Sequence, residues 1–334
     1  MGSASSSEKK LLAGGIMIYL DQPNYRPGDM VVGNVYINMA QSFSTSCLEL
    51  ILKVEQYTNF IYENNNLPEF GLRKGRDIEN RFEGYKKLYH AKAILAKFTQ
   101  NLISPGQYQY PFSFKLPPNL PGSFEYYDET NTAYVTYILE ARLGTFNSTN
   151  EIKNSTLIIV NQPLQSLGVS GFRENTANLK SWCCFPKGTS TLRVSLPKAN
   201  FYTNDKVIAN CEFDNLKTSL DGKNITIMLI QQIIIKDNYG KFKQLNRHLS
   251  NLNYRNIYPH REVSKFILEI PLMDYDNPTL KYLHKCDHIN LLKNSDLVSH
   301  LQASISSELI NCTYTLKIVT SYYTHFMSSR NKIG

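Results

Sequence analysis

Short segments in which hydrophobic and polar residues alternate recur along almost the whole chain. The clearest examples are residues 48–54, 108–116 and 135–143, where every second position is hydrophobic. A period of two places one face of a strand against a core and leaves the other face in solvent. The pattern therefore predicts antiparallel β-sheets packed as sandwiches, an all-β fold.

The second half of the chain continues in the same way. Predicted strands cover residues 192–196, 207–213, 225–235, 266–270, 301–305 and 314–319. Residues 62–89 are polar and charged and predict a long loop. Residues 91–103 predict a strand followed by a helical turn, which Pro105-Gly106 ends.

An internal repeat divides the chain into two halves. Residues 20–37 align without a gap to residues 196–213, with hydrophobic residues in the same register. A length of 334 residues also exceeds what one core usually serves. We therefore expect two tandem immunoglobulin-like β-sandwich domains, in residues 12–162 and 188–334. A flexible N-terminus at residues 1–11 and an interdomain connection at residues 163–187 complete the prediction.

Charge and cysteine patterns narrow the function classes. The formal net charge is +8, but no run of like charges is long enough for a nucleic-acid-binding arm. The six cysteines are scattered without a Cys-x-x-Cys pair, and the sequence begins without a signal peptide, which favours a reducing, cytoplasmic location. No apolar run approaches the roughly 18 residues that span a bilayer. We expect no nucleic-acid partner.

Motifs typical of enzymes are absent from the sequence. It contains no nucleophile elbow, P-loop, His-Glu-x-x-His or dinucleotide fingerprint. His284, Cys286 and His288 are residue types that bind zinc, but their spacing is unusual for zinc and no second group completes four ligands. We expect no catalytic activity, no cofactor, no metal and no small-molecule substrate.

Residues 110–121, Tyr-Pro-Phe-Ser-Phe-Lys-Leu-Pro-Pro-Asn-Leu-Pro, are similar to a motif that arrestins carry late in their N-terminal domain. Residues 24–35 resemble the first arrestin hairpin, and residues 134–143 resemble the strand after the motif. Residues 182–185, Trp-Cys-Cys-Phe, resemble the start of the C-terminal domain in the arrestin-domain-containing, or α-arrestin, branch. This resemblance implies the arrestin fold over most of the chain.

The resemblance implies a non-catalytic intracellular adaptor or scaffold. Its partners would be cytoplasmic parts of membrane proteins and trafficking proteins, in endocytosis, sorting or signalling. The sequence departs from α-arrestins in having no Pro-Pro-x-Tyr motif for ubiquitin ligases. One alternative is an arrestin-like structural subunit of a larger assembly, such as a retromer-like coat or a cytoskeletal complex. Another is a secreted adhesion protein, which would use the four glycosylation sequons at Asn147, Asn154, Asn224 and Asn311.

The N-terminal sequence Met-Gly-Ser-Ala-Ser-Ser fits the N-myristoylation pattern, with Gly2 as the acceptor. The alternative is an unmodified, disordered start or a vector-derived Met-Gly-Ser. One acyl chain binds membranes only marginally, so a second signal is needed. Cys183 and Cys184 are candidates for palmitoylation, with burial at the domain junction as the alternative. Such an anchor predicts an anionic membrane surface as a further partner, with the protein peripheral on the plasma membrane or endosomes.

Phosphate recognition requires Lys or Arg side chains that converge on one surface. By resemblance, the candidates are the basic residues of the N-terminal strands, where arrestins gather such groups. They are Lys9, Lys10, Arg26 and Lys53. The alternative is that these residues are ordinary solvated side chains.

Overall fold

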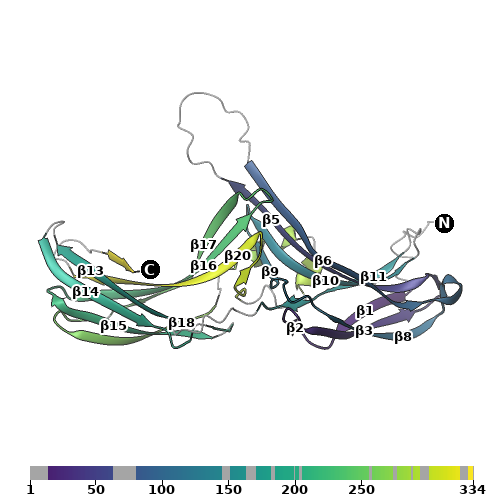
Figure 1. Ribbon diagram of the computed structural model, residues 1–334, viewed down its shortest axis with the longest axis horizontal. Helices are drawn as coiled ribbons and strands as arrows, with labels where there is room; N and C mark the ends of the chain where they lie inside the picture. The colour runs from purple at the N-terminus through teal and green to yellow at the C-terminus, as the bar shows by residue number, and fades with distance from the viewer. Residues whose placement is uncertain are drawn as a thin grey trace, which may run out of the picture. The chain divides into compact units, whose positions relative to one another are not determined.

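The structure is a computed structural model (Figure 1). It describes residues 14–62, 80–144, 151–162, 171–181, 185–198, 200–202, 205–255, 258–273, 277–286, 289–293, 301–323 and 330–333. β-Strands dominate these residues, which confirms the predicted all-β fold. The described residues form two compact units. Unit 1 lies within residues 1–163, 234–243 and 278–311, and unit 2 lies within residues 164–233, 244–277 and 312–334.

Unit 1 is built on a β-sandwich. Its first sheet has the order β1-β3-β8, formed by Gly14–Leu20, Met30–Met39 and Gly106–Lys115. Its second sheet has the order β11-β10-β5-β6, formed by Ile152–Leu157, Thr132–Gly144, Cys47–Tyr62 and Asn80–Lys97, and β9 (Phe124–Tyr127) pairs with β10. The alternating residues fill the core, because Val35, Leu52 and Tyr137 are all fully or almost fully buried.

Two short strand pairs and one helical turn complete the N-terminal part of unit 1. They are β2 (Asn24–Tyr25) with β12 (Ile159–Val160), β4 (Phe43–Ser44) with β7 (Leu102–Ile103), and the 3-10 turn η1 (Thr99–Asn101). The turn follows β6, which confirms the expected strand and helical turn within residues 91–103. The strand β8 ends at Lys115, immediately before the Leu-Pro-Pro sequence, since proline donates no backbone hydrogen bond to a sheet.

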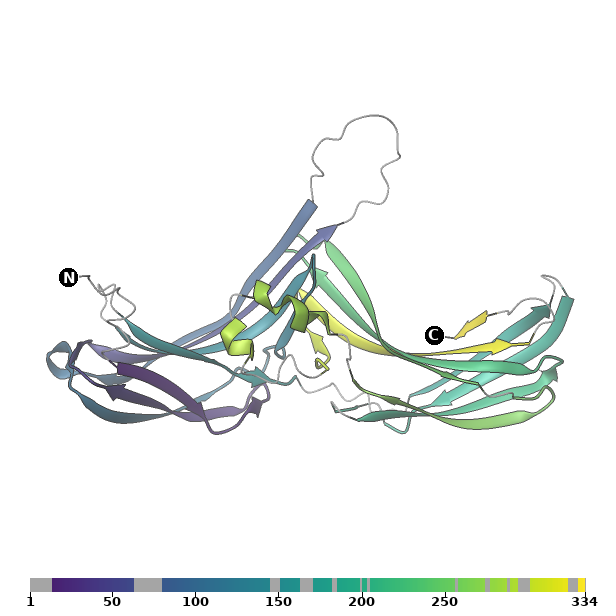
Figure 2. The same ribbon diagram turned by 180° about the vertical axis from the view of Figure 1, so that it is seen from behind.

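Segments from the second half of the sequence also belong to unit 1. They contain α2 (Pro278–Tyr282), η2 (Leu283–Lys285), α3 (Ile289–Lys293) and β19 (Ile305–Ser306). Figure 2 shows these short helices over the second sheet, where Cys286 packs with Tyr127 of β9 in a small buried cluster.

Unit 2 contains a second sandwich. One sheet has the order β13-β14-β15-β18, formed by Phe172–Ser181, Phe185–Ser195, Lys206–Thr218 and Val263–Pro271. The other has the order β17-β16-β20-β19, in which β17 is Phe242–Tyr254, β16 is Gly222–Lys236 and β20 is Ile310–Tyr322, and β21 (Arg330–Ile333) pairs with β20. Strand β19 and the ends of β16, β17 and β20 fall within unit 1.

The two copies of the internal repeat form equivalent turns in unit 1 and unit 2. The Asp29 carboxylate accepts a hydrogen bond of 2.7 Å from the backbone N–H of Arg26, and Asp205, the aligned residue, accepts one of 3.0 Å from Tyr202. The carbonyl of Asp29 accepts the N–H of Leu116 at 2.9 Å, and the carbonyl of Asp205 makes the equivalent bond to a later strand end at 3.0 Å. The aligned strands β3 and β15 therefore enter their sheets through the same local geometry.

Four segments differ from the sequence predictions. Of the strand predicted at residues 301–305, only Ile305 lies in a strand, which is β19. Strand β6 begins at Asn80, inside the predicted loop at residues 62–89. Strand β13 lies inside the predicted connection at residues 163–187, and β17 occupies residues for which no strand was predicted. Both β13 and β17 are rich in polar residues on both faces, so their sequences carry little alternation.

Candidate partner-binding surface

The far end of the β5–β6 hairpin carries a surface that we call the hairpin crest. It consists of residues 58–62 of β5, residues 80–87 of β6 and residues 236–243, which join β16 to β17. All three segments belong to unit 1. Strand β10 pairs with β5 only as far as Asn59, so beyond that residue β5 and β6 form a two-stranded ribbon. Such a ribbon is marginally stable by itself, and it requires further packing.

The turn in residues 236–243 is closed by its own polar residues. The Asp237 carboxylate accepts hydrogen bonds from the backbone N–H groups of Tyr239 at 2.9 Å and Lys241 at 2.8 Å. Gly240 has a φ of +87°, which glycine adopts without steric cost. The turn leaves the Tyr239 side chain 92% exposed.

Close contacts hold this turn against the ribbon. The Thr58 hydroxyl donates a hydrogen bond of 2.5 Å to the backbone carbonyl of Lys236, and the backbone N–H of Tyr85 donates one of 3.1 Å to the Asn238 side chain. Gly84 permits this approach, because a Cβ there would lie 2.6 Å from the Thr58 hydroxyl and 2.7 Å from the Lys236 carbonyl oxygen. The crest is therefore a joint structure of both halves of the sequence.

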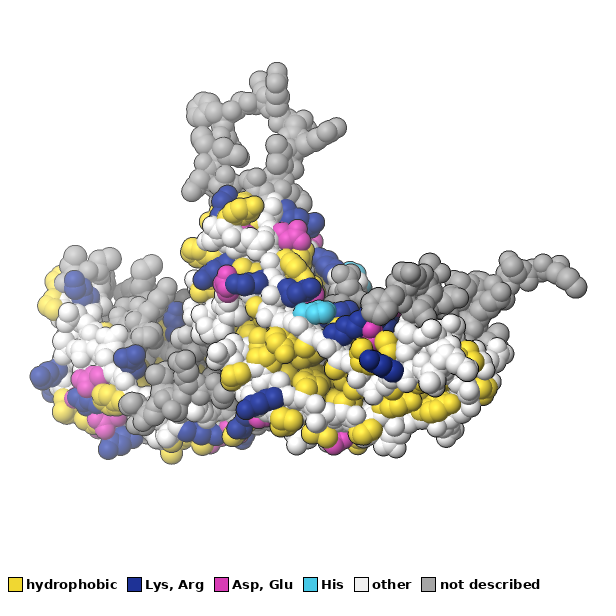
Figure 3. Space-filling model, turned by 45° about the vertical axis from the view of Figure 1, so that its right-hand side comes forward, with side chains coloured by type: hydrophobic (Ala, Val, Ile, Leu, Met, Phe, Trp, Pro, Cys, Tyr) yellow, Lys and Arg dark blue, Asp and Glu magenta, His cyan; other side chains and the backbone are white. Residues whose placement is uncertain are grey.

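Aromatic and basic side chains dominate the exposed surface of the crest. Lys241 Nζ lies 4.3 Å from the centre of the Phe82 ring, a cation–π contact. Figure 3 shows hydrophobic and basic side chains interspersed at the end of the β5–β6 hairpin, below the uppermost grey atoms. The exposed aromatic residues are Tyr62, Tyr85, Tyr239 and Phe242, and the exposed charged residues are Arg81, Lys86, Lys87, Lys236, Lys241 and the acidic Glu83.

This composition suits protein recognition. Aromatic side chains and arginine are enriched where protein interfaces concentrate their binding free energy. Lys86 already pairs with Glu308. The four other exposed basic residues outnumber Glu83, and this excess favours a partner segment that carries negative charge. Sequence reasoning missed the residues of the turn, although Asp-Asn-Tyr-Gly after a long hydrophobic strand is a recognisable turn signal.

A second group of basic residues lies on the half-exposed face of the second sheet of unit 1. Lys53 pairs with Glu140 at 3.3 Å, and Glu49 pairs with Lys92 and, at 2.6 Å, with Arg142. Burial raises the pKa of Glu49, but hydrogen bonds from Lys92 and Arg142 outweigh it, so the net pKa lies below its usual value. Carboxylates already neutralise these bases, and an incoming phosphate would have to displace them.

The residues predicted to bind phosphate or lipid are placed only in part. Arg26 is exposed in the turn between β2 and β3, whereas Lys53 lies on β5 of the other sheet, so the structure does not bring these two together. The other five lie outside the described residues: Gly2, Lys9, Lys10, Cys183 and Cys184. Their roles stay predictions.

The described part of the chain has neither a cluster of metal-binding side chains nor a membrane-spanning helix. No group of three or more His, Cys, Asp or Glu side chains there is arranged to hold a metal ion. Among the helices described, none has the length and apolar character needed to cross a membrane.

Two sandwich units that repeat one turn and one strand register define a tandem β-sandwich protein. The family model "Arrestin (or S-antigen), N-terminal domain" matches residues 16–165, and the model "Arrestin (or S-antigen), C-terminal domain" matches residues 186–333. The two matches cover most of the sequence, so the chain belongs to the arrestin family. Proteins of this family are generally non-catalytic adaptors that bind receptors and trafficking proteins.

Curated relatives share parts of this sequence. Arrestin domain-containing protein A of Dictyostelium discoideum is 24% identical over 211 residues, which cover 60% of this chain and 34% of that protein. Phosrestin-1 of Drosophila melanogaster and phosrestin-1 of Calliphora vicina are each 26% identical over 175 residues, which cover 50% of this chain and 43% of each relative. The matched region thus spans less than half the length of these relatives.

Proposed function

We propose that this chain is a non-catalytic adaptor that binds cytoplasmic parts of membrane proteins through the hairpin crest. It would link them to proteins of endocytosis, sorting or signalling. The observation that carries this proposal is the crest, which presents exposed aromatic rings and an excess of positive charge on a docked turn. Membership of the arrestin family supports it, since arrestins generally bind receptors and trafficking proteins.

Binding involves no covalent step. An acidic or phosphorylated segment of a membrane protein approaches the basic side chains, and opposite charge raises the rate of association. The rings of Tyr239 and Phe242 then supply buried contact area, and truncating a central aromatic anchor typically costs about 2 kcal/mol, or roughly 30-fold in Kd. Because the Asp237 hydrogen bonds preorganise the turn, binding requires little ordering of the backbone.

The proposal includes attachment of the protein to the membrane surface by lipid groups. Myristoylated Gly2 and palmitoylated Cys183 or Cys184 would supply the two signals that stable anchoring requires, with Lys9 and Lys10 attracted to anionic lipid. The protein would then be cytoplasmic and peripheral on the plasma membrane or endosomes. Mass spectrometry of the N-terminal peptide and of the Cys183-Cys184 peptide from native protein tests both modifications.

The proposal is tested by affinity purification of tagged protein from its own cells, with and without phosphatase. Two matched variants distinguish the loss of a crest residue from the loss of any exposed tyrosine. Tyr239→Ala removes the crest residue, which is 92% exposed, and Tyr202→Ala removes a tyrosine of unit 2 that is 77% exposed. We expect membrane proteins to be lost with Tyr239→Ala and kept with Tyr202→Ala.

The alternative function gives a different result. A structural subunit would co-purify with one set of partners at constant stoichiometry, unaffected by phosphatase. Recovery of the same partners with Tyr239→Ala and with the native crest would show that the crest is not the binding surface.

A further inference from the structure

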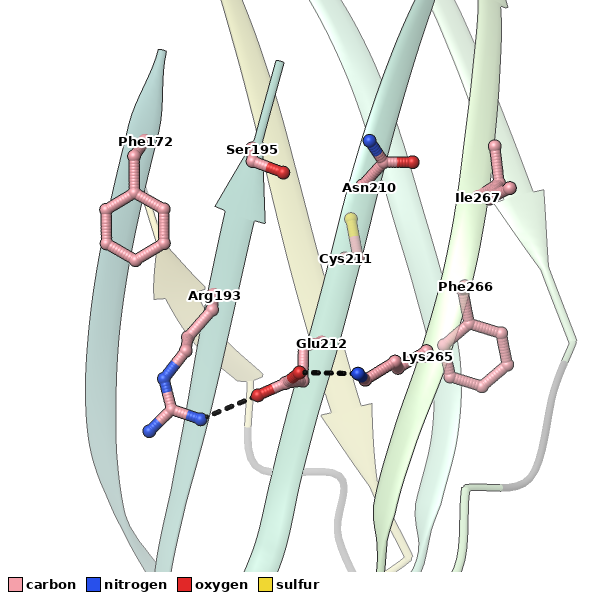
Figure 4. Close-up of a pocket in the computed structure, with 9 residues that line it drawn as sticks. All are labelled: Phe172, Arg193, Ser195, Asn210, Cys211, Glu212, Lys265, Phe266 and Ile267. Atoms are coloured by element: carbon pink, nitrogen blue, oxygen red, sulfur yellow. Dashed lines mark hydrogen bonds and ion pairs between the residues drawn. The ribbon is translucent and has the colours of Figure 1, made fainter. Parts of the chain in front are cut away.

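The outward face of the sheet β13-β14-β15-β18 in unit 2 is open and carries a shallow hollow of about 540 Å³. Figure 4 shows that the residues around it come from all four strands. Phe172 and Ile267 stand at its two sides and are 56% and 67% exposed. Single exposed apolar side chains are common on protein surfaces, so the significance of these two depends on the residues between and beside them.

A row of alternating charge crosses this face. The register places Glu174, Arg193, Glu212 and Lys265 side by side on β13, β14, β15 and β18. Arg193 donates hydrogen bonds to Glu174 at 3.2 Å and to Glu212 at 2.8 Å, and Lys265 pairs with Glu212 at 3.4 Å. The sign of the charge therefore alternates from one edge of the sheet to the other.

The neighbouring row has a pattern of its own. Phe172, Ser195, Asn210 and Ile267 occupy adjacent positions on the same four strands. The row is apolar at both ends and polar in the middle, and Ser195 and Asn210 form the floor between the two larger residues (Figure 4).

When two copies of the chain face each other across one two-fold axis, both rows meet complementary residues of the other copy. A two-fold axis parallel to the strands, between β14 and β15, brings β13 of one copy over β18 of another. Glu174 then faces Lys265 of the second copy, and Phe172 faces Ile267 of the second copy. The inner residues match as well, because β14 meets β15 and Arg193 meets Glu212 of the second copy. A two-fold axis at right angles to the strands that runs along the charged row would instead place like charges opposite each other.

We propose that this face docks a second copy of the chain in an isologous dimer with that axis. Strands about 4.8 Å apart, with about nine residues each rising about 3.3 Å, give a face of roughly 600 Å² per copy. The total of roughly 1,200 Å² lies at the lower limit of specific interfaces. The dimer is therefore expected to form at micromolar concentration, and not to be obligate.

Sedimentation velocity of the full chain, from about 1 to about 300 µM, tests the proposal because this range brackets a micromolar Kd. The informative variant is Ile267→Lys, which places a charge opposite the Phe172 ring. Its matched control is Ile94→Lys, an isoleucine that is 51% exposed on β6 of unit 1. Circular dichroism confirms that both variants fold. We expect at least a tenfold weaker dimer with Ile267→Lys and no change with Ile94→Lys.

A charge exchange tests the axis itself. Lys265→Glu places two acidic residues opposite each other and should weaken the dimer several-fold, a typical size for an exposed pair. Adding Glu174→Lys restores opposite charges across the axis and should recover affinity. A monomer over the whole concentration range overturns the proposal. So does an equal effect of the two isoleucine variants, or a double variant weaker than Lys265→Glu alone.

Discussion

Replacement of Glu125 by glutamine should remove a large part of the pH dependence of the stability of unit 1. Glu125 lies on β9 and is fully buried. One carboxyl oxygen accepts a hydrogen bond of 2.8 Å from the Tyr127 hydroxyl, and the other has no hydrogen-bond partner among the described residues. Burial raises the pKa of Glu125 well above 4.5, and the bond from Tyr127 offsets only part of this.

The sign of the effect follows from proton binding. Above pH 4.5 the unfolded chain loses the Glu125 proton, whereas the folded protein keeps it until the pH reaches the raised pKa. The folded state thus binds more protons, and the free energy of unfolding falls by up to about 1.4 kcal/mol for each pH unit in this window. Below pH 4.5 Glu125 is protonated in both the folded and the unfolded state, so it no longer lowers the free energy of unfolding.

Glutamine at position 125 does not titrate, so the variant should lack this slope. Its amide leaves buried donors without partners, at a cost of about 1–3 kcal/mol. That cost does not depend on pH, and the slope is therefore the quantity to measure. From about pH 5.5 upward, the stability of Glu125→Gln relative to the native chain should rise by up to about 1.4 kcal/mol for each pH unit below the raised pKa.

Urea denaturation at about pH 5.5, 6.5 and 7.5, followed by circular dichroism, gives the three unfolding free energies. Glu129→Gln is the matched control, because Glu129 lies four residues away and is exposed. The control should keep the native slope. If Glu125→Gln also keeps it, Glu125 is charged in the folded protein and the argument from burial is refuted.

Two further predictions concern packing. Gly84→Ala places a Cβ against Thr58 and the Lys236 carbonyl, so it should lower the free energy of unfolding by about 1–3 kcal/mol. It should also speed hydrogen exchange in residues 236–243. Unchanged exchange in these residues would contradict the prediction. Burial raises the pKa of the Cys211 thiol to about 12 and that of Cys312 to about 11, so iodoacetamide at pH 8 should label both only after denaturation, as peptide mass spectrometry can show. Labelling of the folded chain would refute the burial of these thiols.

The fold could be predicted where one face of each strand is buried. The long strands β5, β10 and β16 alternate strictly enough to be read from the sequence. Strand β17 has a single buried residue, Leu249, and β13 has mostly exposed residues. Neither strand therefore shows the alternation of hydrophobic and polar residues from which a strand can be predicted. The helices α2 and α3 have five residues each, too few for a helical period to show.

The burial of Glu125 was less predictable than the strands, because the residues around it meet only through the fold. Glu125 lies just after the motif at residues 110–121, but residues that pack over β9 come more than 150 positions later in the sequence. Gln302 accepts a hydrogen bond of 3.2 Å from the backbone of Glu125, and Thr279 accepts one of 3.2 Å from Tyr127. Burial of this kind depends on long-range contacts, which no local pattern encodes.

The hairpin crest depends on the same long-range contacts. In the part of the chain that the structure describes, no third strand pairs with β5 or β6 beyond Asn59. The ring of Phe82 stacks there with that of Phe60 at 5.6 Å between centres. The turn supplies the missing support, since Lys243 donates a hydrogen bond of 2.8 Å to the carbonyl of Ile61 while Lys241 covers Phe82. The N-terminal half alone would leave a two-stranded ribbon without this turn. The surface proposed to bind partners therefore forms only when residues 234–243 are folded against it, and recognition is tied to the folding of both halves of the chain.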